Sequence, residues 1–378
     1  MRIEKAVLRQ LSLPFKKPFR TSFGELKVKD FLLLELVGAE GISGWGECSA
    51  LTRPWYNEET TEGARYVLSA FLIPELLKDE IPSPEAFFDK TSWIRRNRMA
   101  RSAADCALWD LWSRERGISE KEALGGVRSS IEAGVSLGIE PSPQALVKTV
   151  ESYLKQGYRR VKLKIKPGAD VAYVKAVRDA FGNIPLTVDA NSSYRLSDID
   201  ALRALDEFGL LMIEQPLAHD DIVEHARLQK VLSTPICLDE SIDSTSAAKS
   251  AIALGSCRII NIKVARVGGL TEARRLQAYA AEHGVGCWCG GMVDAGVARG
   301  HNLAAASLPN YIYPNDIPGS DRYYADDITT PSVSVGRDAM IAVPDGPGTG
   351  FEPDLSVIGR HTVRTWTWRR GAAGPEES

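Results

Sequence analysis

The feature that most limits the fold is a regular alternation of short apolar segments with amphipathic ones after residue 132. The apolar segments have the length of buried strands, and the segments between them carry apolar residues at helical spacing. Seven such units in about 160 residues indicate parallel strands joined by crossover helices. The strands read AGVSLGI, RVKLKI, LTVDA, LMIEQ, ICLDE, IINIK and GCWCG. A closed barrel or an open doubly wound sheet would both fit this pattern.

The flanking segments have a different character. Residues 1–48 alternate like antiparallel strands, and residues 57–125 are helical and rich in Glu, Ala, Leu and Arg. Near the C-terminus, the alternating segment HTVRTWTWRR could rejoin the N-terminal sheet. The predicted divisions are an α+β domain over 1–128, a barrel over 129–325, a returning C-terminal segment over 326–368 and a disordered tail over 369–378.

Charged side chains end successive apolar segments at nearly constant spacing. They are Lys164, Asp189, Glu214, Asp239 and Lys263, and the steps between them are 25, 25, 25 and 24 residues. In a closed barrel the carboxyl ends of the strands meet at one mouth, where the active sites of this fold lie. A single acid after a strand often caps the next helix. Five charged residues in register instead favour a barrel with an active site at its mouth.

The three acids of this series predict a metal site. Carboxylates that face one point repel each other unless a cation neutralises them. Oxygen ligands suit Mg²⁺, for which Mn²⁺ could substitute. The expected ligands are Asp189, Glu214 and Asp239. The side chains expected to support them through hydrogen bonds are Asn191, Gln215 and Glu240.

The lysines of the series predict proton transfer. Lys162, Lys164 and Lys166 alternate with apolar residues, so they share one face of a strand. Neighbouring positive charges disfavour the protonated form, so we expect a lysine pKa lowered toward neutral pH, as a general base needs. Lys164 would end the second barrel strand and Lys263 the sixth, on opposite sides of the mouth. The alternative interpretation is a solvated basic strand.

Bulk properties exclude several classes of function. The net charge of −3 gives no indication of binding to nucleic acid or anionic lipid. No apolar run reaches the length of about 18 residues typical of a membrane span, and the N-terminus lacks the apolar block of a signal peptide. The scattered cysteines predict reduced thiols and a cytoplasmic location. Cys287 and Cys289 lack a second Cys or His pair at zinc spacing, so we interpret them as structural.

Short motifs across almost the whole chain resemble the enolase superfamily, in its muconate lactonizing subgroup. They are PFRTSFG, GWGEC, NRMARSA, GVSLGI, RVKLKIKPG, TVDANSSY, MIEQPL, ICLDES, NIKVARVGG, CWCGGM and SDRYY. Within the subgroup they are most similar to the family of o-succinylbenzoate synthases and N-succinylamino acid (N-acylamino acid) racemases. The resemblance implies a (β/α)7β modified TIM barrel with an α+β capping domain, bound magnesium, a small-molecule carboxylate substrate and a homo-oligomer.

The resemblance also implies roles for individual residues. The three acids would bind the metal, and Lys164 and Lys263 would be the acid–base pair on opposite faces of the substrate. Lys162 would be the electrostatic partner of Lys164, and Arg266 could tune the basicity of Lys263. The residues implied to contact substrate are Phe19, Ser22, Phe23, Tyr56, Ser136, Gly291, Met292 and Val293. For the aromatic residues of this set, packing between the domains is the alternative.

Two activities fit these residues, and both begin with removal of an α-proton. One is o-succinylbenzoate synthase, a lyase of menaquinone biosynthesis that dehydrates 2-succinyl-6-hydroxy-2,4-cyclohexadiene-1-carboxylate. The other is racemisation of N-succinylamino or N-acylamino acids, in which the two lysines exchange roles. A non-catalytic metal-binding barrel is a remote alternative, because such a protein would be expected to lose a charged strand end. Asp294 and Ala295 depart from the family's usual Glu and Ser or Thr, which leaves the succinyl contacts open.

Overall fold

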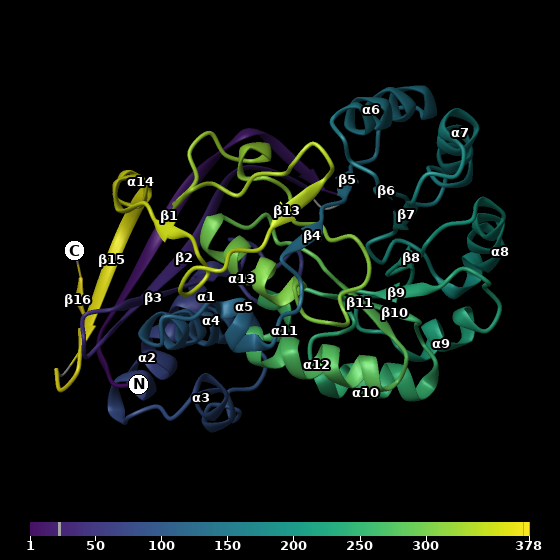
Figure 1. Ribbon diagram of the computed structural model, residues 1–378. Helices are drawn as coiled ribbons and strands as arrows, with labels where there is room; N and C mark the ends of the chain where they lie inside the picture. Colours follow the sequence, from purple (N-terminus) through teal and green to yellow (C-terminus); the bar gives the residue numbers. More distant parts are fainter. Residues whose placement is uncertain (22–23, 373, 378) are drawn as a thin grey trace.

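An antiparallel sheet built from both ends of the chain forms one side of the molecule, and a ring of parallel strands forms the other (Figure 1). The computed structural model describes residues 1–21, 24–372 and 374–377. Side chains are described for 1–18 and from 25 onward, apart from 373 and 378.

The antiparallel sheet has the strand order β16-β15-β1-β2-β3. Its strands are β1 (Ile3–Thr21), β2 (Gly24–Gly38), β3 (Ser43–Cys48), β15 (Thr362–Arg369) and β16 (Glu376–Glu377). The helices that follow β3 are α1 (Thr61–Val67), η1 (Leu68–Leu72), α2 (Ile73–Lys78), α3 (Pro84–Lys90), α4 (Arg98–Glu115) and α5 (Glu120–Leu124). Leu8 and Leu34 of the sheet are fully buried in one core with α1, α2 and α4. This part is the predicted α+β capping domain.

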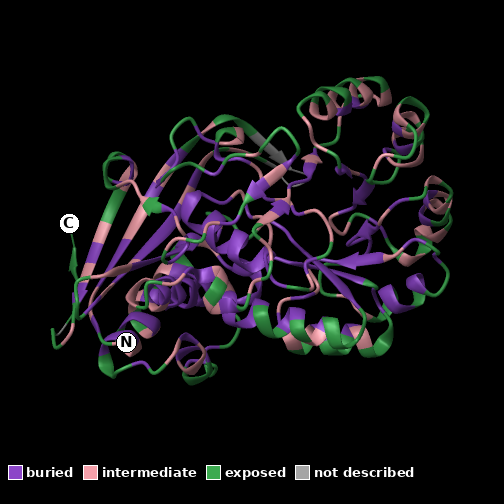
Figure 2. Cartoon of the chain, viewed as in Figure 1, coloured by how far each residue is buried: buried purple, intermediate pink, exposed green. Residues whose placement is uncertain are grey.

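Helix α4 packs directly on β3, because two glycines of that strand leave no side chain between them. A Cβ at Gly44 would lie 2.4 Å from Ala107 O, and one at Gly46 would lie 2.0 Å from Ala103 O. The opposite side of α4 contacts the barrel helices α11 (Val264–Val267) and α12 (Leu270–Glu282). A helix enclosed in this way is buried around its whole circumference, and most of α4 is buried in Figure 2.

The parallel strands follow the sequence order, β5 to β11, around the ring. They are β5 (Val135–Leu137), β6 (Val161–Lys164), β7 (Leu186–Asp189), β8 (Ile213–Glu214), β9 (Ile236–Leu238), β10 (Ile259–Ile262) and β11 (Gly286–Cys289). The other elements of the connections are α6 (Pro143–Lys155), α7 (Val171–Phe181), η2 (Leu196–Asp198), α8 (Ile199–Arg203), η3 (Ala204–Phe208), α9 (Val223–Gln229), α10 (Thr245–Leu254) and α13 (Gly296–Ala306). Figure 2 shows the strands buried and the outer faces of α10 and α12 exposed.

An eighth extended segment, residues 311–316, bridges the first and last strands of this sheet. Ile312 N donates to Cys287 O of β11 at 3.0 Å, and Asn315 N donates to Glu132 O, just before β5, at 2.8 Å. The bridges to Cys287 and to Ala133 are both parallel. The ring therefore closes as (β/α)7β, which confirms the predicted barrel and excludes the open doubly wound sheet.

The C-terminal residues contact both parts of the molecule. The remaining elements are β4 (Ser130–Glu132), η4 (Ser320–Arg322), β12 (Thr329–Thr330), β13 (Met340–Ala342), β14 (Glu352–Pro353) and α14 (Leu355–His361). β13 pairs with β4 before the barrel, and β15 pairs with β1. We therefore propose the divisions 1–128, 129–325 and 326–368 as stated from the sequence.

The expected disordered tail needs one correction. Within 369–378, Glu376 and Glu377 form β16 and pair with Thr367 and Trp366 of β15. The physical reason is that β15 would otherwise be an edge strand with unpaired backbone groups, which attract another strand. Among the described residues, no helix is long and apolar enough to cross a membrane.

Candidate active site

Strand register explains why charged residues 25 positions apart meet at the mouth of the barrel. Lys164 is paired in register with Asp189, and Asp189 with Glu214, along three neighbouring parallel strands. Asp239 and Lys263 each follow the last residue of the next two strands, β9 and β10. The structure thus brings all five predicted strand ends to one mouth.

Each acid of this series lies beside a lysine. Lys164 Nζ is 2.7 Å from Asp189 Oδ2, and Lys263 Nζ is 2.8 Å from Asp239 Oδ2. Lys162, two residues before Lys164 on the same strand face, is 2.9 Å from Glu214 Oε2. The three acids are at most 1 % exposed, whereas the Lys164 side chain is 30 % exposed. Lys164 is therefore the most accessible of the three lysines.

Asp316 is a member of this cluster that the sequence analysis missed. Its Oδ2 lies 2.6 Å from Lys162 Nζ, and its Oδ1 lies 2.6 Å from Arg160 Nη2. It ends the closing segment of the barrel, as Asp189 ends β7. The signal was present, since Tyr311–Ile312–Tyr313 alternates like a short strand and Asp316 follows it.

Amide side chains hold the acids in place. Asn191 accepts a hydrogen bond from Lys164 Nζ and donates to Glu240 Oε1 at 3.0 Å. Gln215 Oε1 accepts the backbone N–H of Asp239 at 2.9 Å. Asn191 and Gln215 both have positive φ, 40° and 37°, which an L residue adopts only when its surroundings compensate for the strain. The three predicted supporting residues are therefore in contact with the site.

Asn261 also supports the site, and like Asp316 it was not predicted from the sequence. Its Nδ2 donates to Glu214 Oε1 at 2.8 Å from strand β10. The residue precedes Lys263 by two, so it faces the same side of the strand as the lysine.

The loop before α1 brings Tyr56 over Lys263. Tyr56 OH accepts from Lys263 Nζ and from Arg266 Nη1, both at 3.2 Å, and donates to Asp239 Oδ1 at 3.2 Å. The ammonium of Lys263 also lies 4.5 Å from the centre of the tyrosine ring. Arg266 itself donates to Asp239 Oδ1 and to Ile242 O. Tyr56, Arg266 and Lys263 therefore form one network around Asp239.

The lowered pKa expected for a lysine on strand β6 does not hold for Lys162. Burial opposes the charge of Lys162, but Asp316, Glu214 and Asp189 outweigh burial and raise its pKa. Burial also opposes the charge of Lys263, and its surroundings, foremost Tyr56, outweigh this effect and raise its pKa. The acids around Lys162, and Tyr56 beside Lys263, therefore outweigh both burial and the neighbouring cations.

The pKa values of the acids are shifted in opposite directions. Burial raises the pKa of Glu214, with Asp189 as the next cause, and burial likewise raises the pKa of Glu240. Although burial opposes it, the attraction of Lys164 and Lys162 lowers the pKa of Asp189.

The donor set fits a hard divalent cation. Among the described residues, no group of three or more His, Cys, Asp and Glu side chains is arranged as a formed metal site. The reason is that the expected ligands lie against lysines or Arg266 in this structure. Within the described part of the chain, Glu240 Oε2 and Asn261 Oδ1 are buried without a hydrogen-bond partner. These oxygens and the three buried carboxylates are the ligand type that Mg²⁺ and Mn²⁺ prefer.

The expected substrate contacts are only partly placed. Ser22 and Phe23 lie outside the described residues, as does the side chain of Phe19. Ser136 is opposite Lys162 in register, so both side chains lie on the same face of the barrel sheet. Met292 is only 7 % exposed and belongs to the core of the capping domain. Met292 therefore packs between side chains of that core, and its contact with substrate stays a prediction.

The segment after β11 is held by internal hydrogen bonds. Gly291 and Val293 are half-buried, and Val293 O accepts from Tyr324 OH at 2.6 Å. Asp294, which departs from the family pattern, is buried and accepts from Ser49 Oγ at 3.1 Å and Asn302 Nδ2 at 2.9 Å. Asp294 therefore joins the capping domain to the barrel through its bond with Ser49.

A cleft of about 480 Å³ opens beside this network. It lies between the loop that carries Tyr56 and the barrel loops after β8 and β9. Its lining residues are Tyr56, Asn57, Glu58, Arg96, Arg98, His219, Asp220, Ile222, Glu240, Ser241, Asp243, Ala247 and Arg266. Tyr56 and Arg266 belong to the network, and Glu240 accepts a hydrogen bond from Asn191, so the cleft leads into the site.

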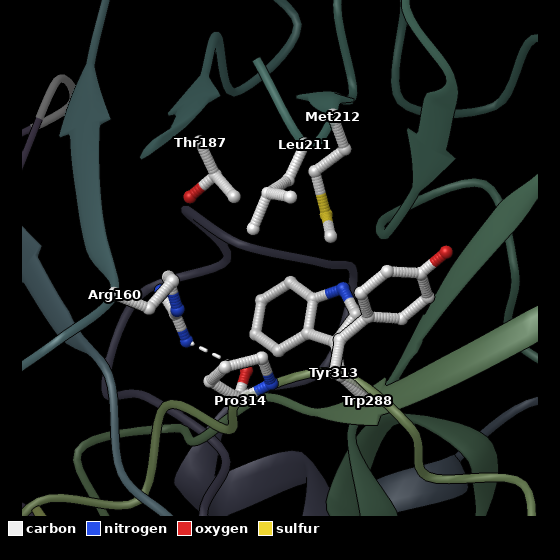
Figure 3. Close-up of a pocket in the computed structure, with 7 residues that line it drawn as sticks. All are labelled: Arg160, Thr187, Leu211, Met212, Trp288, Tyr313 and Pro314. Atoms are coloured by element: carbon white, nitrogen blue, oxygen red, sulfur yellow. Dashed lines mark hydrogen bonds between the residues drawn. The ribbon is translucent and has the colours of Figure 1, made fainter. Parts of the chain in front are cut away.

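A second hollow lies at the opposite end of the barrel (Figure 3). Its lining residues are Arg160, Thr187, Leu211, Met212, Trp288, Tyr313 and Pro314. Trp288 occupies its middle, Arg160 Nη2 donates to Pro314 O at 2.9 Å, and the hollow has no room for a water molecule. Lys162 Nζ lies 4.8 Å from the centre of the Trp288 ring, so Trp288 lies directly beneath the charged cluster.

Comparisons with known proteins agree with this architecture. Residues 3–125 match the model "Mandelate racemase / muconate lactonizing enzyme, N-terminal domain", and residues 145–357 match "Enolase C-terminal domain-like". The chain is 50 % identical to an o-succinylbenzoate synthase of Geobacillus stearothermophilus over 98 % of both chains. It is 46 % identical to an N-succinylamino acid racemase of Thermus thermophilus, over 98 % of this chain and 99 % of the relative.

A crystal structure of an enolase superfamily member from Listeria innocua has a TM-score of 0.96 and 42 % identity. The match covers 98 % of this chain and 100 % of the other. The two matched domains, the closed barrel and the charged strand ends lead to one conclusion: the chain belongs to the enolase superfamily, among the mandelate racemase and muconate lactonizing enzymes.

Proposed function

We propose that this protein is an o-succinylbenzoate synthase, which removes the proton beside a carboxylate and then eliminates water. The observation that carries the proposal is the position of Lys164 at the end of strand β6 and of Lys263 directly after strand β10, on either side of three buried acids. The similarity to o-succinylbenzoate synthases, at 46–50 % identity over nearly the whole chain, supports the substrate.

Lys164 is the proposed base. It is the most exposed of the three lysines, and Asp189 and Asn191 fix its ammonium group through hydrogen bonds. The neutral amine would take the α-proton, and the electron pair of the broken C–H bond would remain on the substrate. Lys162 would stay charged between Glu214 and Asp316 and keep the acids in position.

Lys263 would act from the other face. In dehydration its positive charge would stabilise the negative charge that develops on the substrate. Asp189, Glu214 and Asp239 would hold Mg²⁺ or Mn²⁺, and such an ion supplies further positive charge to the developing anion. The departing hydroxyl needs one proton, which the protonated Lys164 could return.

N-succinylamino acid racemase activity is the second candidate. It needs a base on one face of the α-carbon and an acid on the other, which the two lysines would supply in turn. Arg266 favours this activity, because it shares Tyr56 and Asp239 with Lys263 and so can influence the basicity of that lysine. Both activities share the first proton transfer, so one site can support both.

The direct experiment offers the purified protein each substrate with magnesium. We expect conversion of the cyclohexadiene carboxylate to o-succinylbenzoate, measured by the change in absorbance, and racemisation of N-succinylamino acids, measured by polarimetry. Lys164→Ala should abolish the dehydration. If Lys164→Ala dehydrates the substrate at the wild-type rate, the proposed base is wrong.

We also propose a cytoplasmic homo-oligomer that acts in menaquinone biosynthesis and has no nucleic-acid or membrane partner. The six free, buried cysteines support a reducing compartment, where thiols persist. The net charge of −3 supports the absence of a polyanionic partner.

A further inference from the structure

One stripe of helix α4 touches the chain immediately after Lys263. Ser102, Asp105 and Trp109 lie three and four residues apart, so they project from the same side of the helix. All three are at most 2 % exposed. None of them lies in the charged cluster, although Asp105 and Trp109 are buried polar groups that face the barrel.

Asp105 caps a helix that belongs to the other domain. Helix α12 begins after Gly269, which has no side chain to accept the unpaired N–H groups of the first turn. Asp105 Oδ2 accepts the backbone N–H of Thr271 at 2.9 Å, and Asp105 Oδ1 accepts the Thr271 hydroxyl at 2.7 Å. Trp109 Nε1 donates to the same hydroxyl at 2.9 Å. The capping domain therefore supplies the N-cap that α12 lacks.

The contact depends on a glycine. Gly269 has φ +123°, a conformation that L side chains rarely adopt. A Cβ at this position would lie 2.3 Å from Asp105 Oδ2. The turn between α11 and α12 is thus shaped to admit the carboxylate of Asp105.

Three further hydrogen bonds connect this contact to Lys263. Ser102 Oγ donates to Val264 O at 3.3 Å, and Gly269 N donates to the same oxygen at 2.9 Å. Lys263 O accepts from Val267 N at 3.1 Å, which closes the short helix α11. The backbone that carries Lys263 is held on its C-terminal side by the capping domain.

Lys164 has no comparable connection among the described residues. Its described partners are Asp189 and Asn191, which both belong to the barrel. The two proposed acid–base lysines are therefore positioned by different parts of the molecule.

We propose that Ser102, Asp105 and Thr271 form a clamp that positions Lys263 for proton transfer and leaves Lys164 unaffected. They are positioning residues, since they act through the backbone of 263–271 and touch no reacting atom. The inference rests on the proposed acid–base roles of the two lysines. It identifies the capping domain as a determinant of the balance between the two faces of the substrate.

The test measures each face of the substrate separately. In D₂O, a lysine that removes the α-proton of an N-succinylamino acid can return a deuteron, and NMR follows the exchange for each enantiomer. Lys164→Ala and Lys263→Ala assign one enantiomer to each lysine. Thr271→Val keeps the side-chain shape and removes the hydroxyl, and Asp105→Asn removes the carboxylate charge.

We expect Thr271→Val and Asp105→Asn to slow exchange on the Lys263 face by about tenfold to a hundredfold, the order of loss that a misplacement near 1 Å produces. Exchange on the Lys164 face should change less than about twofold. A displacement confined to Lys263 leaves Lys164 correctly placed against the α-carbon of the substrate. Thr271→Ser should restore the wild-type ratio. Asp354→Ala removes another helix N-cap, at α14, and should leave the ratio unchanged. Equal losses on both faces would overturn the clamp.

A second measurement does not depend on activity. If the clamp holds the segment, hydrogen–deuterium exchange at the amides of Val267 and Gly269 should be faster in both clamp variants, while β6 stays protected. Unchanged protection at these amides would overturn the inference. If the wild-type protein exchanges neither enantiomer, the proposed function fails, and the amide measurement still decides whether the clamp exists.

Discussion

His301 should make the stability of the fold depend on pH in the alkaline range. Its Nδ1 lies 3.0 Å from both carboxylate oxygens of Glu120 on α5, and its Nε2 lies 2.9 Å from Trp45 O on β3. Burial opposes the charge of the imidazolium, but the attraction of Glu120 outweighs burial and raises the pKa of His301 to about 9. The pair joins the capping domain to helix α13 of the barrel.

The magnitude follows from the two pKa values. A folded pKa of about 9 against about 6.5 in the unfolded chain gives stabilisation on the order of 2 to 3 kcal/mol at pH 7. By the same relation almost none of this stabilisation remains at pH 9.5. Because the folded pKa is the higher one, the stabilisation is complete below pH 6.5 and is lost as pH rises through 9. His301 is 1 % exposed and Glu120 is fully buried, so solvent does not screen the pair.

Urea unfolding followed by tryptophan fluorescence, at several values between pH 7 and pH 9.5, measures this loss. The wild-type free energy of unfolding should fall by about 2 kcal/mol more than that of His301→Gln over this range. The matched control is His283→Gln, at the exposed end of α12, which should titrate like the wild type. If wild type and His301→Gln show the same pH dependence, the charged pair does not stabilise the fold as argued.

The remaining predictions concern the metal, the clustered charges, the close contact of α4 with β3, and Phe19. EDTA should abolish activity and magnesium should restore it. Asp239→Asn should lower the affinity for magnesium, measured by calorimetry. Full activity of the metal-free protein would disprove the proposed metal site. Asp316→Asn should cost about 3 kcal/mol of unfolding free energy in urea, because it leaves buried cations without their partner; a wild-type midpoint would contradict this. Gly46→Ala should cost about 3 kcal/mol in the same assay, since its Cβ meets backbone, and an unchanged midpoint would mean that α4 can move. Phe19→Ala should raise KM and shift substrate preference, and unchanged constants for both substrate classes would exclude Phe19 from substrate recognition.

Much of the barrel mouth could be predicted from the sequence because its determinants are local. A strand buried on both faces reads as an apolar run, and a charged residue at its end is conspicuous. One strand–helix unit takes about 25 residues. Residues 25 positions apart therefore lie side by side on neighbouring strands, as Asp189 and Glu214 do. The predicted positions of Lys164, Asp239 and Lys263 follow from the same periodicity.

The features that were missed depend on contacts between distant segments. Asp316 sits at the end of a closing segment that no helix follows, so it lies outside the strand–helix repeat. The raised pKa of Lys162 depends on the acids around it, and that of Lys263 on Tyr56 first and then on Glu240 and Glu214. The Asp294 side chain is directed into the interior because it accepts a hydrogen bond from the hydroxyl of Ser49, some 245 positions away in the sequence. Sequence spacing carries no information about such pairs.

The pairing of β1 with β15 has a consequence for synthesis on the ribosome. Lys5 of β1 lies opposite Arg369 of β15. Because β1 is translated first and β15 near the end of the chain, the two strands can pair only after every barrel strand has been translated. Throughout that interval β1 can pair with β2 on one edge, while its other edge presents open backbone groups. A nascent chain stalled before residue 362 would therefore expose a 19-residue strand to any other extended segment nearby, including the same strand of a neighbouring nascent chain.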